Sequence, residues 1–144
     1  MKFADTIRAA READDWSLLV AAIPFAAFLG LRIEVQDYGA TCVLPAQGRL
    51  VGNPLLPALH GGAIAGFMEC AAILYLLRHR DSADLPKTVD FSVDYLRSGK
   101  LLDTFAAVQV VKAGALVAHI RVEAWQTDPA RPIATGHGNF LLQP

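Results

Sequence analysis

The stretch "HGGAIAGFMECAAILYLLRHR", residues 60–80, decides the fold of this chain. Between Gly61 and Leu77 every residue is apolar or small except Glu69. We expect a helix over 61–79, which ends in a run of cations because positive charge suits the carboxyl end of a helix dipole. A helix that is apolar on all sides has to be covered on all sides, so the rest of the chain must wrap around it.

Glu69 is the exception in this helix, and its presence needs an explanation. Taking an ionised carboxylate out of water is costly unless a partner compensates for the lost hydration. A buried acid can be satisfied by hydrogen bonds or kept neutral by a raised pKa, or it can be an acid that performs chemistry. The residues around Glu69 leave these readings open.

Upstream of the long helix, we expect a first helix over 5–22 that ends before Pro24, because proline lacks the amide and clashes with the preceding turn. Three further segments follow in order: a strand over 31–35, a second strand over 40–44 joined to it by the turn "QDYG", and a loop over 45–59 that is rich in proline and glycine.

Downstream, the stretch "TVDFSVDYL", residues 88–96, alternates strictly between apolar and polar side chains. This alternation is typical of a half-buried strand and puts Thr88 and Asp90 on the polar face. Further strands are expected over 104–112, 115–125 and 133–142. One long helix with an antiparallel sheet around it is an α+β arrangement, and residues 1–144 suit a single domain.

The composition narrows the class of protein. The chain is 53% hydrophobic with a net charge of −1, which favours an oligomer and argues against a nucleic-acid partner. The longest uncharged run, 16–31, is too short to span a membrane and contains Pro24, so we expect no membrane partner. Cys42 and Cys70 have no metal-ligand spacing, which indicates reduced, buried thiols in a cytoplasmic protein and no metal site.

Several of these segments together resemble a known family. The stretches "LHGGAIAGFMECAA", "TVDFSVDYLRSGK" and "PIATGHGNFLL" are similar to hotdog-fold acyl-CoA thioesterases, and most similar to the phenylacetate-pathway (PaaI-like) branch. The most specific part is HGG followed by an acid eight residues after its first glycine. The resemblance implies a hotdog fold, in which a curved antiparallel sheet wraps one central helix. It also implies hydrolysis of an acyl-CoA to a free acid and coenzyme A, with coenzyme A as part of the substrate and no other cofactor.

The resemblance also assigns roles around the helix start. Glu69 corresponds to a catalytic carboxylate that acts as nucleophile or general base, and Gly61 to the glycine whose backbone N–H polarises the thioester carbonyl. Unpaired amides at a helix N-terminus do suit an oxyanion. His60 corresponds to a residue that supports the turn or lies near the ligand. Asn53 is the candidate amide that holds the nucleophile or water, or else it caps its own turn. Thr88 is the candidate hydroxyl that assists the water.

Coenzyme A is expected outside the reaction centre. The family's nucleotide-binding loop corresponds to "YLRSGK", residues 95–100, and the turn "KAG" is a further candidate. The predicted coenzyme A contacts are Arg97, Ser98, Gly99, Lys100, Lys112 and Gly114. Arginine and lysine in such a loop can pair with phosphate, or they can be solvated surface cations.

A distance argument links the motif to assembly. Eight residues of helix advance about 12 Å and end about 80° away around the axis. Glu69 should therefore not reach a carbonyl that is held by the Gly61 amide of its own chain. Two antiparallel copies of the helix could bring the two residues together, so we expect a homodimer with shared active sites, as in the family. Whether such dimers pair into a dimer of dimers stays open.

Two alternative functions remain. One is a non-catalytic hotdog protein that binds an acyl-CoA or another small ligand. The other is a hotdog enoyl-CoA hydratase or dehydratase, which would need a catalytic histidine at a different spacing from the acid. Turnover of acyl-CoA, and its loss when Glu69 loses its charge, separates these functions from a thioesterase.

Overall fold

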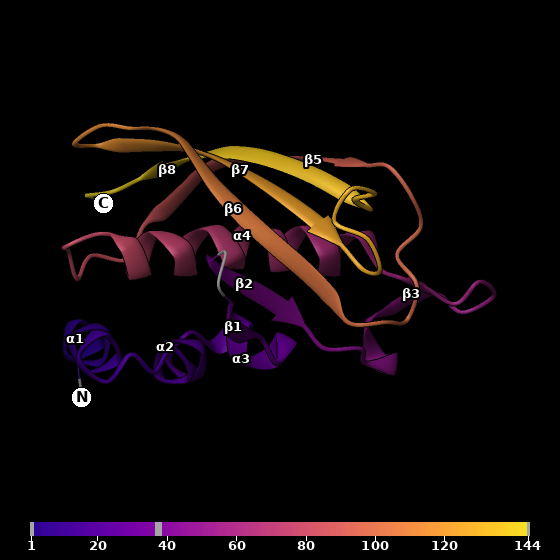
Figure 1. The fold of residues 1–144 in the computed structure, drawn as a ribbon, viewed down its shortest axis with the longest axis horizontal. Helices are drawn as coiled ribbons and strands as arrows, with labels where there is room; N and C mark the ends of the chain where they lie inside the picture. The colour runs from indigo at the N-terminus through magenta and orange to yellow at the C-terminus, as the bar shows by residue number, and fades with distance from the viewer. Residues whose placement is uncertain (1, 37–38, 144) are drawn as a thin grey trace.

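The computed structural model describes residues 2–36 and 39–143. Its central element is the long helix α4 (Gly61–His79), which begins and ends where the sequence predicts. A sheet covers one side of α4, and three N-terminal helices lie on the other side (Figure 1). These are α1 (Phe3–Ala13), α2 (Ser17–Ala22) and α3 (Pro24–Leu29). The predicted α+β arrangement is confirmed.

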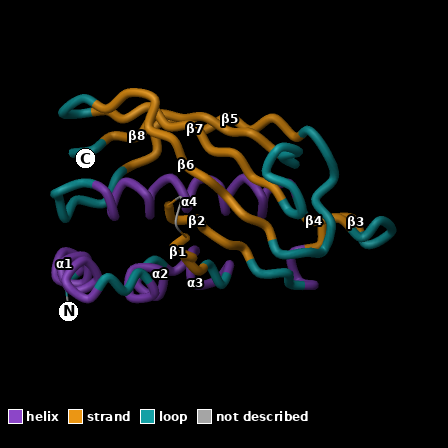
Figure 2. Tube along the Cα trace, in the orientation of Figure 1, coloured by secondary structure: helices purple, strands orange, loops and turns teal. Residues whose placement is uncertain are grey.

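The sheet has six strands in the order β1-β2-β6-β7-β8-β5, and all neighbours are antiparallel. The strands are β1 (Arg32–Gln36), β2 (Gly39–Leu44), β5 (Lys87–Tyr95), β6 (Thr104–Ala113), β7 (Val117–Trp125) and β8 (Ala134–Leu141). Strand β6 crosses α4 obliquely (Figure 2). This is the arrangement that the hotdog resemblance implies, with β1 and β5 as the two edges.

The core lies between the inner face of the sheet and α4. On β7 the alternate residues Ala118, Ile120, Val122 and Ala124 are buried, which confirms the alternation expected there. By length and composition α4 could also cross a membrane, but in this structure it is the core helix of the fold. A helix that is apolar all round is explained by its two covering layers.

The N-terminal region differs from the prediction of one helix over 5–22. Asp14 ends α1 in a left-handed backbone conformation, with φ of 50°, and the Oδ1 atom of Asp15 accepts a hydrogen bond from the Ser17 amide at 3.1 Å as α2 begins. Pro24 does interrupt the chain, but it then serves as the first residue of α3. Proline is favoured there because its missing amide needs no partner at a helix start.

Residues 45–59 also differ from the prediction of a loop. They contain a 3-10 turn, η1 (Gly48–Leu50), and a two-stranded sheet of β3 (Val51–Asn53) and β4 (Ala58–Leu59). The amide of Leu59 donates to the Gly99 carbonyl, and that of His60 to the Leu50 carbonyl, both at 2.8 Å. These bonds anchor the start of α4.

Strand β5 departs from strict alternation at its first residues. The register with β8 shifts between Thr88 and Asp90, which marks a bulge. A bulge adds one residue and re-aims the side chain that precedes it. Thr88 therefore points to α4, while Asp90 faces outward and accepts a hydrogen bond from the Asn139 amide at 2.9 Å. The prediction that Thr88 and Asp90 share a face is wrong.

The two cysteines are free and buried, as predicted. Burial raises the pKa of the Cys42 thiol on β2 to about 12 and that of the Cys70 thiol on α4 to about 11. A thiol with a raised pKa is a poor nucleophile at neutral pH. We therefore assign these two cysteines to the packing of the core rather than to the chemistry of a site.

One arginine ties the N-terminal helices to the end of α4. The Nη2 atom of Arg11 donates to the carbonyl oxygens of Leu77 and Ser82, each at 2.6 Å, and to that of Arg80. The last carbonyls of a helix have no partner within the helix, and the guanidinium charge suits this end of the dipole. Arg11 therefore caps α4 from α1.

We expect Arg11→Ala to lower the free energy of unfolding by about 2 kcal/mol, because carbonyls at the helix end lose a charged donor. Urea unfolding at fixed protein concentration measures this loss. Arg8→Ala is the control: among the described residues Arg8 forms an ion pair only with Asp5, on the surface of α1, so its loss should stay within about 0.5 kcal/mol. Equal losses in the two variants would contradict a capping role for Arg11.

Candidate active site

Glu69 is half-buried on α4, and its Oε1 atom accepts a hydrogen bond from the Thr88 hydroxyl at 2.6 Å. Within residues 2–36 and 39–143 no cation forms an ion pair with this carboxylate. The acid is thus held by a neutral donor at the edge of the core, rather than sealed inside it.

The side of α4 that carries Glu69 is the less covered one. Gly62, Gly66 and Ile73 lie within one turn or two of Glu69 on the same side, and all are at least partly exposed. By contrast, Ala71, Leu74 and Leu77 are buried in the core. The carboxylate therefore lies on the side of the helix where another molecule can approach.

The start of α4 is held by His60. Its Nδ1 atom accepts a hydrogen bond from the Gly62 amide at 2.8 Å, so His60 is the N-cap of the helix. Its carbonyl accepts from the amides of Ala63 at 3.0 Å and Ile64 at 3.2 Å. These contacts are those of a residue that supports the turn, which is one of the two roles that the resemblance allows.

The Gly61 amide has no hydrogen-bond partner in the part of the chain that the structure describes. It is an unpaired N–H at the positive end of a long helix, which is a favourable position for a developing oxyanion. The carbonyl of the same residue accepts a hydrogen bond from the Tyr95 hydroxyl at 2.7 Å. Reasoning from the sequence placed Tyr95 at the start of the 95–100 segment and missed its contact with Gly61.

Within one chain the two halves of the candidate site lie apart. Glu69 contacts Thr88 near the beginning of β5, whereas Gly61 contacts Tyr95 at its end. Along the helix axis, Gly61 and Glu69 are about 12 Å apart. The structure brings Glu69 and Thr88 together, and it keeps Glu69 away from Gly61 of the same chain, as the distance argument expects.

Asn53 lies exposed at the end of β3. Its Oδ1 atom accepts a hydrogen bond from the Leu55 amide at 3.0 Å, which closes a turn of the Asx type. This is the turn-capping role that the sequence left open beside the catalytic one. No hydrogen bond joins Asn53 to Glu69 within the described residues of one chain.

The segment predicted to bind coenzyme A forms a basic groove beside the start of α4. Arg97, Ser98 and Lys100 line this groove, together with a cation that the sequence analysis missed, Arg131. In the sequence, Arg131 is only an arginine in the turn "TDPARP". The residues around it do not indicate that this turn folds beside residues 97–100. Gly99 is buried, and its carbonyl instead accepts the Leu59 amide.

Lys112 and Gly114 lie elsewhere, in an open groove at the β6–β7 hairpin. The basic groove and this hairpin are at opposite ends of β6, whose ten residues span about 30 Å. Figure 1 shows the hairpin at the end of the sheet away from β3. One chain therefore does not bring the two predicted coenzyme A segments together.

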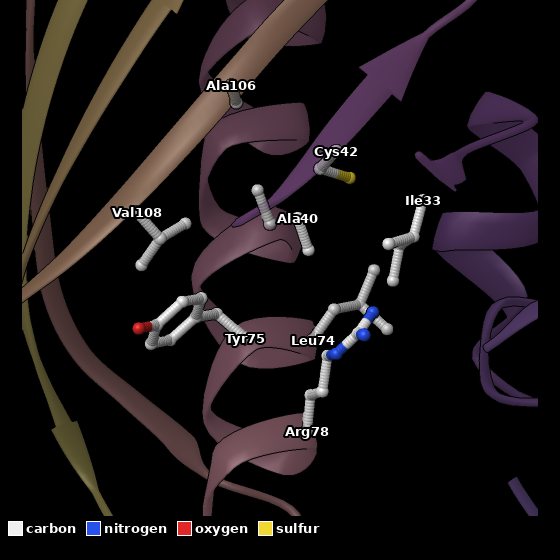
Figure 3. Close-up of a pocket in the computed structure, with 9 residues that line it drawn as sticks. Ile33, Ala40, Cys42, Leu74, Tyr75, Arg78, Ala106 and Val108 are labelled. Atoms are coloured by element: carbon white, nitrogen blue, oxygen red, sulfur yellow. The ribbon is translucent and has the colours of Figure 1, made fainter. Parts of the chain in front are cut away.

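A separate apolar cavity lies between the other side of α4 and the first strands. Figure 3 shows Leu74, Tyr75 and Arg78 of α4 beside Cys42 of β2 and Val108 of β6. Leu74 and Arg78 lie about 140° and 180° around the helix from Glu69, so this cavity is not part of the Glu69 site.

Comparison with known proteins identifies the class. Residues 56–133, which include the HGG motif, Glu69 and the 97–100 loop, match the model of the thioesterase superfamily. This match covers more than half of the chain. The chain belongs to the thioesterase superfamily, and the predicted hotdog thioesterase is confirmed.

Individual relatives refine this assignment. The chain is 34% identical over 125 residues to the medium/long-chain acyl-CoA thioesterase YigI of Salmonella typhimurium, covering 77% of this chain and 81% of the relative. A crystal structure from Chromobacterium violaceum is 38% identical, with a TM-score of 0.79 over 95% of this chain and 96% of that one. A phenylacetic acid degradation-related protein of Ralstonia eutropha shares the fold, with a TM-score of 0.74 and 15% identity over 88% and 98% of the two chains.

The bond between Thr88 and Glu69 can be tested directly. We expect Thr88→Val to lower the kcat of thioester hydrolysis about tenfold, because the carboxylate loses the donor that orients it. Thr88→Ser keeps the hydroxyl and should retain most of the activity. Steady-state kinetics of both variants provide the measurement, and a wild-type kcat in Thr88→Val would show that the bond has no part in turnover.

Proposed function

We propose that this protein hydrolyses acyl-CoA thioesters to a free acid and coenzyme A, in a homodimer whose active sites combine Glu69 of one chain with Gly61 of its twin. The observation that carries the proposal is that one chain holds two incomplete parts of a site, at opposite ends of β5. One end holds a carboxylate that is oriented by Thr88, and the other holds an unpaired helix amide. Family membership supports the thioester chemistry.

The edge of the sheet supports the dimer. β5 is nine residues long and pairs only with β8 within the described sheet. A long unpaired edge is a template for another strand, and Val89 on it is 63% exposed. In an antiparallel pair of two β5 strands, the Thr88 end of one strand meets the Tyr95 end of the other. That pairing would bring Glu69 of one copy toward Gly61 of its twin.

The proposed chemistry needs a base and an oxyanion donor. Glu69 takes a proton from water, and the hydroxide attacks the thioester carbonyl carbon. The Gly61 amide stabilises the negative oxygen of the tetrahedral intermediate. The C–S bond then breaks, and the coenzyme A thiolate recovers the proton from Glu69. In the other route that the sequence left open, Glu69 itself attacks the carbonyl carbon and expels the coenzyme A thiolate. Water then hydrolyses the resulting anhydride to the free acid and regenerates Glu69.

The basic groove is the proposed place for the nucleotide end of coenzyme A. Arg97, Lys100 and Arg131 supply three cations against one acid, Asp128, so the groove keeps a positive balance that suits phosphate groups. The groove adjoins the start of α4 through the bond between the Leu59 amide and the Gly99 carbonyl. A substrate whose carbonyl is at Gly61 would therefore extend toward this groove.

We further propose a medium or long acyl chain, because the relative is named for that substrate class. The proposed reaction needs no metal or redox cofactor, since a carboxylate and a backbone amide suffice. A cytoplasmic location is consistent with two free thiols.

The sharing of the active site can be tested by complementation. We expect Glu69→Gln to lower hydrolysis about a thousandfold, because the base is lost. Gly61→Pro should lower it about a hundredfold or more, since proline removes the amide at a position where helices accept it, while its ring also displaces the Tyr95 ring slightly. Co-expressed with different tags, the two inactive chains should recover about a quarter of wild-type activity, because half of the dimers are hybrids with one intact site.

The controls separate the alternatives. Each variant is assayed alone for free thiol from a panel of acyl-CoAs, and circular dichroism checks that it folds. Absence of recovery in the mixed dimers, with both single variants folded, would place the site in one chain. Tight binding without turnover by the wild type would instead indicate a binding protein, and addition of water to enoyl-CoA would indicate a hydratase.

The basic groove gives a second test. We expect the double variant Lys100→Ala with Arg131→Ala to raise KM for an acyl-CoA about tenfold, because two phosphate partners are lost. The kcat/KM for the same acyl group on N-acetylcysteamine, which has no nucleotide, should be unchanged. Arg121→Ala, on the exposed face of β7, is the matched control. An unchanged KM for acyl-CoA in the double variant would exclude the groove.

A further inference from the structure

We propose that Tyr95 is a positioning residue, which holds Gly61 so that its amide aims at the oxygen of the reacting thioester. This inference rests on the proposed function, in which the Gly61 amide is the oxyanion donor. The Tyr95 hydroxyl would then be the second hydroxyl of β5 that serves the site, at the opposite end of the strand from Thr88.

The geometry anchors both peptide groups that flank the Gly61 Cα atom. In the peptide before it, the His60 carbonyl accepts the amides of Ala63 and Ile64. In the peptide after it, the Gly62 amide donates to Nδ1 of His60 at 2.8 Å, and the Gly61 carbonyl accepts the Tyr95 hydroxyl at 2.7 Å. The Gly61 amide is the one polar group of these two peptides without a partner among the described residues.

This anchoring matters because residue 61 is a glycine. Glycine has no Cβ atom and explores more backbone conformations than any other residue, so an amide next to it is easily misdirected. The Tyr95 ring also limits what can stand at this position: a Cβ atom on Gly61 would lie 3.2 Å from Cζ of Tyr95. The ring and its hydroxyl therefore add to the restraints that the contacts of His60 already place on this glycine.

The position of Tyr95 suits this role. It is the last residue of β5 and is 53% exposed in the single chain, beside the helix start rather than in the core. The core therefore does not depend on its hydroxyl. Fixing a donor before the charge develops is how a backbone amide contributes to catalysis, because no reorganisation is then needed in the transition state.

The test is Tyr95→Phe, which removes only the hydroxyl. We expect kcat to fall about fivefold, the effect of one neutral hydrogen bond, while KM stays within about twofold. The matched control is Tyr75→Phe, since Tyr75 packs against His79 near the other end of α4, with ring centroids 4.1 Å apart. It should have wild-type kcat and KM, and both variants should unfold at the wild-type urea concentration.

A double-mutant cycle separates positioning from a merely structural effect. In the Gly61→Pro background there is no amide to aim, so adding Tyr95→Phe should leave the residual rate unchanged. An equal fivefold loss in both backgrounds, or a wild-type kcat in Tyr95→Phe alone, would overturn the proposal. Failure of the proposed function has a different signature, because Glu69→Gln would then hydrolyse acyl-CoA at the wild-type rate.

Discussion

The structure depends on one constraint, which is that an almost wholly apolar helix must be removed from water. α4 has few polar side chains with which to face solvent, so the sheet covers one side of it and the N-terminal helices the other. The side with Gly62, Gly66 and Glu69 is less completely covered. The same demand for burial that builds the fold thus leaves a carboxylate on a side of the helix where a second molecule can approach.

Strand β5 links this packing to the candidate chemistry. Its bulge turns Thr88 from the outer face toward Glu69, and its last residue, Tyr95, reaches the start of α4. A regular strand would have left Thr88 in solvent, since alternate side chains point to opposite faces. β5 is also an open edge. A single element therefore orients the acid, restrains the glycine and offers the surface on which the proposed dimer forms.

Much of this could be predicted because it is local in sequence. The long helix, the alternation of β7, and the motif with Gly61 and Glu69 all follow from neighbouring residues. The failures are also local: the turn at Asp14, where two helices replace one, and the bulge after Thr88 depend on backbone choices that hydrophobic pattern does not encode. The thioesterase class could be inferred from the motif. The hydrogen-bond partners of the side chains in that motif could not.

The sequence by itself determined the central helix, its single acid, the glycine at its start and the α+β class, because these depend on periodicity and on residue types at short spacing. Only the tertiary structure decided that Thr88 bonds Glu69, that Tyr95 bonds Gly61, and that Arg131 joins the 97–100 loop. It also separated Lys112 from that loop by the length of β6. The physical reason is that such contacts join residues far apart in the chain, and only the register and curvature of the sheet specify which of them meet.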